Sequence, residues 1–423
     1  MTSITQKCSK QFLGAAIRVV TLALFLVVFG ASAALAQTRA YVSNVNDGFI
    51  SVIDTATNTI VSTIPVSFPD GLAVTPDGKF IYVLERVHGN VLVISTTTET
   101  IVATVPVGGG GGPIEISPNG AFAYYADGSG TISVISTATN TVTATIPLGG
   151  FVTSMAFTPN GAFAYVTDLF SGNVIVIDTA TNTVTATVSI GGGFFFGGPV
   201  GVAITPNGAF AYVTTAFSTD VFVISTATNT VATTIPVGFQ TGALAITPNG
   251  AFAYVTNQDA HTILVIATAT NTVVATVPIG GGPDDVAITP NGAFAYVTDG
   301  GSFTGNVSVI DTATNTVVAT VPVGAFPQYI AIGTQQTTIT SLIGQVQALV
   351  TAGTLTQQKG QQLIHKLEQA QKHLDKGQTN PTCNQLDQFI NDVNSLINNG
   401  SLTPAQGQPL INGANAIKAS NGC

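Results

Sequence analysis

The sequence predicts an all-β ring of seven four-stranded blades, a β-propeller, followed by a small all-α domain. Three observations predict this fold class. A unit of mostly 41 or 42 residues recurs seven times, each unit divides into four short strand-like segments, and the composition shifts to Gln, Asn, Leu and Lys after the last unit. We therefore divide the chain into a signal peptide (residues 1–36), a seven-bladed propeller (residues 37–335) and a four-helix domain (residues 336–423).

The first 36 residues have the order typical of a secretory signal peptide. Lys7, Lys10 and Arg18 precede an apolar run at residues 19–30, and small residues end in Ala-Leu-Ala just before Gln37. An uncleaved anchor is the alternative. It is disfavoured because strand-like sequence begins near residue 40, which leaves almost no tether, and because no cysteine follows the cleavage site for lipid attachment. We expect a secreted protein, extracellular, periplasmic or at the cell surface, with no membrane span after cleavage.

The seven units share two signatures. One is I-D-T-A-T-N-T or a close variant, and the other is the tyrosine of A-Y-V-T. These tyrosines are Tyr41, Tyr82, Tyr124, Tyr165, Tyr212, Tyr254 and Tyr296. Their spacing is 41 or 42 residues, except for 47 residues between Tyr165 and Tyr212, where a Gly- and Phe-rich insert lies at 191–198. A fixed period of this length predicts repeated structural units, with insertions in their loops.

The seventh unit shows its four segments most clearly. β-Branched and aromatic residues dominate at 285–289, 293–297, 307–310 and 316–321, as strands require. The first two segments are joined by Thr-Pro-Asn-Gly, in which Pro fixes φ and Asn-Gly tolerates a tight reversal. The last two are joined by Asp-Thr-Ala-Thr-Asn, whose Asp and Asn can bond the backbone of a turn. Each unit is thus predicted to form one blade.

The two ends of the repeat region complement each other. The first unit lacks an innermost strand, and the last unit is followed by a surplus strand-like segment at 329–333. Pairing this segment with the three N-terminal strands gives seven complete blades and leaves no open inner edge. We expect the ring to close in this way.

The repeated run T-P-N-G-A-F-A-Y-V-T followed by V-I-D-T-A-T-N-T resembles the YVTN family of bacterial and archaeal β-propellers, across residues 37–335. The resemblance implies the fold and not an activity, because propellers host many activities. Such repeats also resemble propeller enzymes of the lactonase or lyase kind. Without tryptophan, the chain cannot carry the WD motif of another propeller group.

The C-terminal segment predicts a duplicated helical hairpin. The apolar residues Ile343, Val346, Leu349 and Val350 recur 47 residues later as Ile390, Val393, Leu396 and Ile397. Gly-Thr-Leu-Thr at 353–356 recurs as Gly-Ser-Leu-Thr at 400–403, where Gly can end one helix and Thr can cap the next. The pattern resembles the small FIMAH-type helical domain of exported bacterial proteins, a resemblance that names no activity.

The cysteines and histidines of this segment favour a disulfide bond over a metal site. Cys383 and Cys423 remain after signal removal and flank the second hairpin, so they predict one disulfide in an exported chain. His365 and His373 lie on a different predicted helix and are too few for a metal site, so we interpret them as solvent-facing. No metal or other cofactor is implied.

Composition and motifs exclude several classes of function. Hydrophobic residues make up 45% and charged residues 7%, so the chain is not disordered. Residues 37–335 contain three basic and sixteen acidic residues, a net charge of −13, so nucleic acid is not an expected partner. G-x-S-x-G, H-E-x-x-H, EF-hand and P-loop motifs are absent from the sequence, and no catalytic residue is assigned.

Candidate functional residues are therefore the departures from the repeat. Five units have alanine three places before the turn proline and Ala331 is the equivalent residue in the last strand, whereas the third unit has Glu115. A lone carboxylate on an innermost strand needs a partner or water. Further candidates are expected at the end of the channel where the innermost strands begin: Asp70, Glu85, Arg86, His88, Asp284 and Asp285. Together these residues predict an acidic mouth.

Two interpretations of this mouth stay open. It is a ligand or cation site, or it holds an acid–base pair of His88 with Glu115 or Glu85. The structural alternative is that Arg86 only neutralises a carboxylate and that the loop is solvated.

The function that the sequence favours is an exported, non-enzymatic propeller, a binding or scaffold protein of the cell envelope or extracellular space. We expect a monomer whose partner on the propeller face is an unknown protein, a glycan or a small molecule. The alternative is a propeller enzyme of lactonase or lyase type, with its site at the mouth of the second and third blades. A phosphorylated substrate fits poorly, because a single arginine, Arg86, is available near the mouth to bind a phosphate group.

Overall fold

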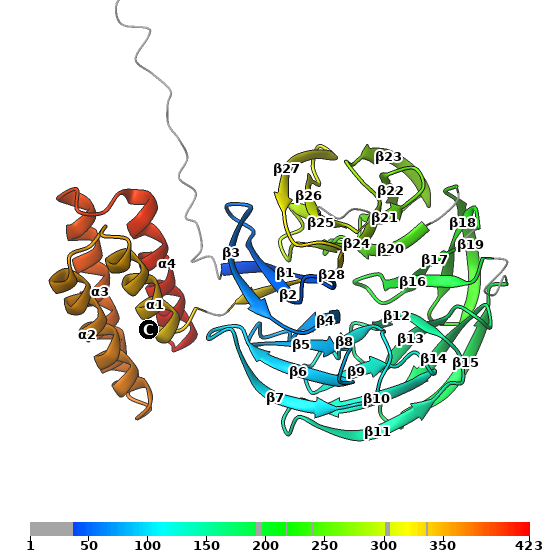
Figure 1. Ribbon diagram of the computed structural model, residues 1–423, viewed down its shortest axis with the longest axis horizontal. Coiled ribbons are helices and arrows are strands. Elements are labelled where there is room, and N and C mark those ends of the chain that lie inside the picture. Colours follow the sequence, from blue (N-terminus) through cyan, green and yellow to red (C-terminus); the bar gives the residue numbers. More distant parts are fainter. Residues whose placement is uncertain (1–36, 192–196, 217, 239–240, 301–304, 336) are drawn as a thin grey trace, which may run out of the picture.

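The structure is a computed structural model that describes residues 37–191, 197–216, 218–238, 241–300, 305–335 and 337–423. The predicted signal peptide, residues 1–36, lies outside these ranges. The described residues form seven four-stranded antiparallel sheets arranged as a ring, with four helices beside it (Figure 1). The predicted fold class is confirmed.

Blade 1 is assembled from both ends of the repeat region. Strand β28 (Pro327–Gln335) pairs antiparallel with β1 (Gln37–Asn44), which is followed by β2 (Phe49–Asp54) and β3 (Thr59–Pro65). Tyr41 on β1 lies opposite Ala331 on β28. The surplus segment at 329–333 is therefore the innermost strand of the first blade, and the predicted closure of the ring is confirmed.

The other six blades follow in chain order, each written from its innermost to its outermost strand. Blades 2 to 4 are β4 (Pro69–Val74), β5 (Phe80–Glu85), β6 (Asn90–Ser95), β7 (Thr100–Pro106); β8 (Ile114–Ile116), β9 (Phe122–Ala126), β10 (Thr131–Ser136), β11 (Thr141–Pro147); and β12 (Val152–Phe157), β13 (Phe163–Asp168), β14 (Asn173–Asp178), β15 (Thr183–Ser189). Blades 5 to 7 are β16 (Pro199–Ile204), β17 (Phe210–Thr215), β18 (Asp220–Ser225), β19 (Thr230–Pro236); β20 (Thr241–Ile246), β21 (Phe252–Asn257), β22 (Thr262–Ala267), β23 (Thr272–Pro278); and β24 (Pro283–Ile288), β25 (Phe294–Asp299), β26 (Asn306–Asp311), β27 (Thr316–Pro322).

The propeller core lies between adjacent blades. The two middle strands of each blade are almost completely buried, whereas the outermost strand is largely exposed. Between blades 4 and 5, Tyr165 and Val176 pack with Val213 and Ile224. The sheets thus pack face to face around the ring.

Six of the seven repeated tyrosines also join their blade to the next one. In each of these junctions, the tyrosine hydroxyl donates a hydrogen bond to the side-chain oxygen of the asparagine in the A-T-N-T turn of the next blade. The pairs are Tyr82–Asn140, Tyr124–Asn182, Tyr165–Asn229, Tyr212–Asn271, Tyr254–Asn315 and Tyr296–Asn58. We call these six bonds the latches. They give the asparagine of the repeat a role across the blade junction as well as in its turn.

The junction between blades 1 and 2 is different. The asparagine position is Glu99, with the same positive φ of 54°. Its carboxylate accepts a hydrogen bond from Ser62 on β3, with an oxygen–oxygen distance of 2.7 Å. Among the described residues, the hydroxyl of Tyr41 makes no hydrogen bond that corresponds to a latch. Burial raises the pKa of Tyr41, the nearby Arg39 opposes this rise, and the charge of Glu99 adds to it.

The C-terminal domain consists of α1 (Ile339–Thr351), α2 (Gln357–Leu374), α3 (Thr379–Asn398) and α4 (Pro404–Ser420). Gly353 and Gly400 have φ values of 72° and 75°, and Thr356 and Thr403 are the N-caps of α2 and α4. The predicted Gly-x-Leu-Thr turns are therefore confirmed. A separate core includes the fully buried Phe389. None of the described helices is long and apolar enough to cross a membrane.

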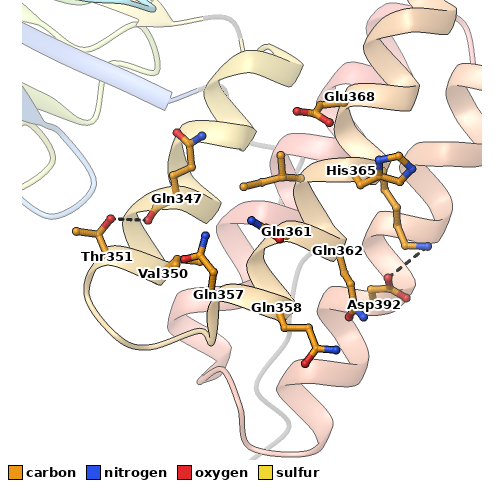
Figure 2. A pocket seen from close by; sticks show the side chains of 12 residues that line it. Gln347, Val350, Thr351, Gln357, Gln358, Gln361, Gln362, His365, Glu368 and Asp392 are labelled. Carbon is orange, nitrogen blue, oxygen red and sulfur yellow. Dashed lines mark hydrogen bonds and ion pairs between the residues drawn. The ribbon is translucent and has the colours of Figure 1, made fainter.

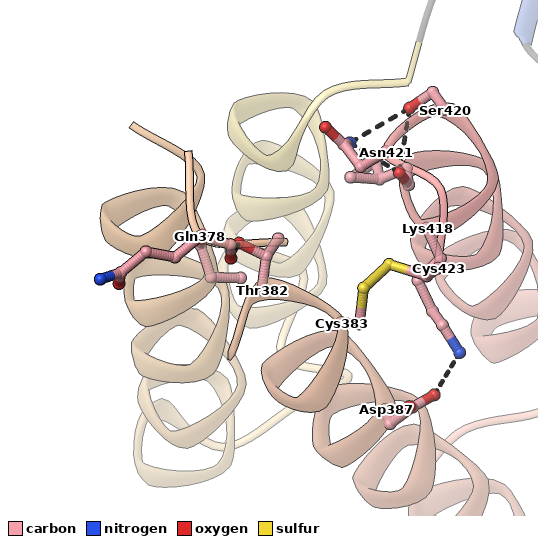
Figure 3. The surroundings of a disulfide bond; sticks show 10 residues. Gln378, Thr382, Cys383, Asp387, Lys418, Ser420, Asn421 and Cys423 are labelled. Carbon is pink, nitrogen blue, oxygen red and sulfur yellow. Dashed lines mark hydrogen bonds and ion pairs between the residues drawn. A yellow bond between two sulfur atoms is a disulfide. The ribbon is translucent and has the colours of Figure 1, made fainter. Parts of the chain in front are cut away.

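The last turn of this domain is joined to α3 through its two cysteines (Figure 3). In the structure a disulfide bond links Cys383 and Cys423, and their Cα atoms lie 5.8 Å apart. Beside them, Lys418 on α4 forms an ion pair with Asp387 on α3. The oxidised state of the pair in the exported protein stays a prediction.

Candidate functional site

The innermost strands surround a central cavity of ≈730 Å³, which we call the channel. Its wall contains alanine at the repeated position in six blades: Ala73, Ala156, Ala203, Ala245, Ala287 and Ala331. On β8 this position is Glu115, opposite Tyr124 on β9. At this position the other six blades present only a methyl group, so the carboxylate of Glu115 is a local exception.

Glu115 is half-buried in the channel wall, and no hydrogen bond from its carboxyl group to another described residue is found. Burial raises its pKa to about 8, and the negative charge of Asp285 across the channel contributes to the rise. Close to neutral pH this carboxyl is therefore largely protonated. In that state it can donate a proton or a hydrogen bond to a group in the channel.

Asp284 and Asp285 lie at the start of β24. The carboxylate of Asp285 accepts hydrogen bonds from the backbone N–H groups of Val286 (2.8 Å) and Ile330 (3.0 Å). Burial raises its pKa to about 7, although these two bonds oppose the rise. Burial also raises the pKa of Asp284 to about 6, while a hydrogen bond from Gln258 opposes it. Both carboxyl groups thus lie close to their ionisation midpoint near neutral pH.

A second cavity of ≈420 Å³ lies where the channel opens at the start of the innermost strands. We call it the mouth pocket, and its main lining residues are Asp70, Arg86, the glycines at 110–112, Phe151, Gln328 and Tyr329. It shares Gln328 and Tyr329 with the channel wall, so the two spaces adjoin. Burial raises the pKa of Tyr329, and the charges of Asp70, Asp285 and Asp284 add to this effect.

Arg86 is paired with Asp70 and not with Glu115. Its Nη1 lies 3.9 Å from Asp70 Oδ2, and the aspartate is buried while the arginine is more than half exposed. Burial raises the pKa of Asp70, and the charge of Arg86 partly offsets this. The carboxylate that Arg86 neutralises is therefore Asp70, and among the described residues no ion pair joins Arg86 to Glu115, which lies in the channel wall.

Glu85 and His88 form a third group, on the rim. His88 Nδ1 lies 3.1 Å from Glu85 Oε1, and Asn90 also donates to the Glu85 carboxylate at 3.4 Å. His88 is 60% exposed, and neither residue lines the channel or the mouth pocket. The seven candidates therefore separate into a channel group (Glu115, Asp284, Asp285), a mouth pair (Asp70, Arg86) and a rim pair (Glu85, His88).

Sequence reasoning missed the aromatic residues of this end. Phe151 and Phe170 stack with ring centroids 5.2 Å apart and an interplanar angle of 25°. Phe151 lies in the loop before β12, where blades 1 and 2 also have a phenylalanine (Phe326 and Phe68), and Phe170 lies in the turn after β13. Neither phenylalanine carries a charge, so neither stands out among the charged residues that predict the mouth.

The described residues contain no group of three or more His, Cys, Asp and Glu side chains that could hold a metal ion. In the helical domain, a surface groove of ≈1170 Å³ is lined largely by glutamines of α1 and α2, with an ion pair between Lys366 and Asp392 at one side (Figure 2). His365 lines this groove, whereas His373 Nδ1 lies 2.7 Å from Gln378 Oε1. The two histidines thus have separate surroundings.

Two family matches follow the division of the fold. Residues 152–322 match the family described as "Lactonase, 7-bladed beta-propeller", and residues 339–419 match the FIMAH domain. The lactonase match spans blades 4 to 7. It includes Asp284 and Asp285 but not Asp70, Arg86 or Glu115. No curated protein matches the sequence.

Solved structures of similar fold come from proteins of different kinds. Hydrazine synthase of Kuenenia stuttgartiensis is 24% identical with a TM-score of 0.57, over 64% of this chain and 92% of that chain. A functionally unknown protein of Desulfotomaculum acetoxidans is 19% identical with a TM-score of 0.62, over 70% and 98%. A proposed 6-phosphogluconolactonase of Bacteroides uniformis is 19% identical with a TM-score of 0.60, over 70% and 99%. At these identities the likeness shows the fold alone.

Proposed function

We propose that this chain is an exported, non-enzymatic propeller that binds a ligand where the mouth pocket meets the channel. One observation carries the proposal. Three acidic residues that break the repeat, the buried Asp70 and the half-buried Glu115 and Asp285, gather around two adjoining cavities at one end of the ring. Concave sites with a few convergent polar groups and shifted pKa values are typical of ligand binding.

The fold itself does not need the charge of Glu115. Six blades close around the channel with alanine at the position of Glu115. A carboxyl group there loses solvation and gains no hydrogen bond from the described protein in return, so it costs stability. A bound ligand that supplies the missing partner would offset this cost.

The proposal places the protein outside the cytoplasm. The basic, apolar and small-residue order of the first 36 residues supports export, and the cysteine pair supports an oxidising compartment. We propose that the helical domain is a second interaction module beside the propeller, because its core is separate from the cores of the ring.

The test is thermal unfolding of the processed protein, residues 37–423, with Ca²⁺, neutral lactones, primary amines and cell-wall sugars. A compound that binds the folded state raises Tm. We expect at least one compound to do so, with the rise lost in Asp70→Asn and Glu115→Ala and kept in Asp259→Asn, a change in an exposed turn. No rise with any compound, or an equal rise in all variants, would contradict the proposal.

A second candidate is a lactonase-type enzyme, which the family match of residues 152–322 favours. Glu115 and Asp285, with pKa values of about 8 and 7, could serve as acid and base near neutral pH. Water would add to the lactone carbonyl, the ring C–O bond would break, and the released alkoxide would take a proton. Titration of acid released from neutral lactones tests this, and Asp285→Asn and Glu115→Gln should each abolish turnover.

A further inference from the structure

We propose that the ligand of the mouth pocket is a neutral carbohydrate whose ring packs against Phe151 and Phe170, which we call the aromatic wall. The inference rests on the proposed function, because it names the class of ligand for the same mouth. Three features carry it: a pair of aromatic rings held in place by the backbone, a run of glycines without side chains, and a buried carboxylate beside them.

The aromatic wall is fixed before any ligand arrives. Phe151 precedes β12, and Phe170 lies in the turn between β13 and β14. The buried carboxylate of Asp168 accepts hydrogen bonds from the backbone N–H groups of both, at 3.0 and 3.1 Å. The Leu169 N–H also donates to the Phe151 carbonyl at 3.0 Å. Phe151 lines the mouth pocket, and Phe170 stacks on Phe151 outside the lining and is 54% exposed, so the aromatic pair begins in the pocket and continues to the protein surface.

Blade 3 faces the pocket with backbone instead of side chains. Residues 108–112 are five consecutive glycines. A Cβ atom at Gly111 would lie 2.4 Å from Asp70 Oδ2, and one at Gly110 would lie 2.7 Å from the backbone nitrogen of Gly128. The hydroxyl of Tyr125 donates to the Gly110 carbonyl at 2.7 Å and holds the glycine run. Asp70 and Gly128 thus occupy the Cβ positions of Gly111 and Gly110, and the glycines keep this wall of the pocket free of side chains.

The polar groups of the pocket suit hydroxyl groups. Asp70 is 4% exposed and offers carboxylate oxygens as acceptors, Arg86 offers N–H donors, and the Gln328 amide offers both. A sugar ring has an apolar face of C–H bonds and a periphery of hydroxyl groups that donate and accept. The aromatic wall would pack against the apolar face of the sugar. Asp70, Arg86 and Gln328 would form hydrogen bonds with the hydroxyl groups at its periphery.

Other ligand classes leave part of this pocket unmatched. An anion would meet Asp70 in the mouth pocket, where Arg86 is already paired, and Asp284 and Asp285 in the adjoining channel. A metal ion lacks a group of ligands among the described residues. A wholly apolar molecule would bury the Asp70–Arg86 pair without new hydrogen bonds, which is costly. A neutral molecule with one apolar face matches the aromatic wall and the polar groups together.

The experiment is calorimetric titration of the processed protein with cellotetraose, maltotetraose and N-acetylchitotetraose. We expect at least one to bind, with a Kd that is nearly unchanged by added salt, because no ion pair forms with an uncharged ligand. Phe170→Ala should weaken binding about 2–10-fold, the usual range for an aromatic contact. Asp70→Asn should also weaken it, whereas Phe170→Tyr should retain it. Phe163→Ala, which removes a partly exposed Phe from the same blade, should leave Kd unchanged.

The outcomes separate this inference from the proposed function. If none of the three sugars binds while another compound raises Tm in an Asp70-dependent way, the mouth site stands and the carbohydrate assignment is overturned. If a sugar binds with equal Kd to the protein and to both Phe170→Ala and Asp70→Asn, the mouth pocket is not its site, and the assignment is again overturned. If no compound of either panel binds, the proposed function fails as well.

Discussion

At the scale of single residues, the repeat allows each side chain to be compared with six equivalents in the same molecule. Alanine at the channel position of six blades shows that packing there needs no charge. Glu115 takes that position with a pKa raised to about 8, mainly by burial. The free energy of unfolding therefore depends on whether Glu115 is protonated.

The stability of the propeller should fall as the pH rises from about 5 to about 8. Folded Glu115 keeps its proton up to about pH 8, whereas the unfolded carboxyl releases it near 4.5. In this window the folded state binds more protons, so the free energy of unfolding decreases with pH, by up to about 1.4 kcal/mol per unit for one group. Asp285, with a pKa of about 7, adds to the fall at the lower end. Urea unfolding across this range measures the slope.

Glu115→Gln should flatten the curve and exceed the stability of the unaltered protein at about pH 9, because the buried charge is removed. Asp259→Asn is the control, since this exposed carboxyl lies in a turn on the same end of the ring. Its curve should match the unaltered protein. A Glu115→Gln curve parallel to that of the unaltered protein would show that the carboxyl does not titrate in this window.

At the scale of strands and turns, what could be predicted depends on how far apart the interacting residues lie in the chain. The Thr-Pro-Asn-Gly turn was predictable because it is local: the Thr289 hydroxyl donates to Asn291 and accepts from the Phe294 N–H. The Tyr212–Asn271 latch joins residues 59 positions apart and depends on the rotation between blades. The Arg86–Asp70 pair lies within blade 2, at the ends of the neighbouring strands β4 and β5, but it depends on the placement of two side chains that the repeat does not specify. Sequence patterns therefore predicted the blades but not the contacts between them.

The latches predict that a Tyr→Phe substitution lowers the free energy of unfolding more where the tyrosine forms a latch than at Tyr41, which forms none. Tyr212→Phe removes a hydrogen bond and leaves the Asn271 oxygen without its donor, so we expect a loss of about 1–2 kcal/mol. Tyr41→Phe removes no latch, because Glu99 occupies the asparagine position, and should cost less than about 0.5 kcal/mol. Urea midpoints of the two variants give the comparison. Equal losses would mean that the latches add nothing to stability.

Glu99→Asn tests the junction between blades 1 and 2 by adding a latch instead of removing one. Asn is better tolerated than Glu at a φ of 54°, and its side-chain oxygen would complete a seventh latch with Tyr41. We expect a gain of about 0.5–1 kcal/mol, reduced by the loss of the Ser62 hydrogen bond. The gain should disappear in the Tyr41→Phe, Glu99→Asn double variant; if it persists, relief of the backbone alone accounts for it.

The cysteine pair gives a prediction for the helical hairpins. Its sequence separation of 40 residues corresponds to about 3–4 kcal/mol in the chain-entropy model. Cys383→Ser should therefore destabilise the helical domain and leave the unfolding of the propeller unchanged, because the two have separate cores. Differential scanning calorimetry distinguishes the two transitions. Two free thiols in mass spectra of the exported protein would contradict the disulfide.

At the scale of the whole molecule, both chain ends of the repeat region meet in blade 1. The helices lie outside the ring beside this blade (Figure 1). They start soon after β28 ends, yet their core contains no propeller residue. The closure was predictable because it requires only a count of strands in each unit. The place of the helices relative to the ring was not, because no sequence pattern specifies the surface beside them.

Truncation at two points separates closure from the helical domain. Removal of residues 337–423 leaves β28 paired with β1, so the propeller should keep its β-sheet circular dichroism and a cooperative thermal transition. Removal of residues 326–423 also deletes β28, which exposes the whole inner edge of β1 and uncovers Tyr41 and Val42. Such an edge pairs with other chains, so this variant should lose the transition and elute as aggregates in size-exclusion chromatography. If it melted as the shorter truncation does, three strands would suffice for blade 1, and β28 would not be what holds the ring closed.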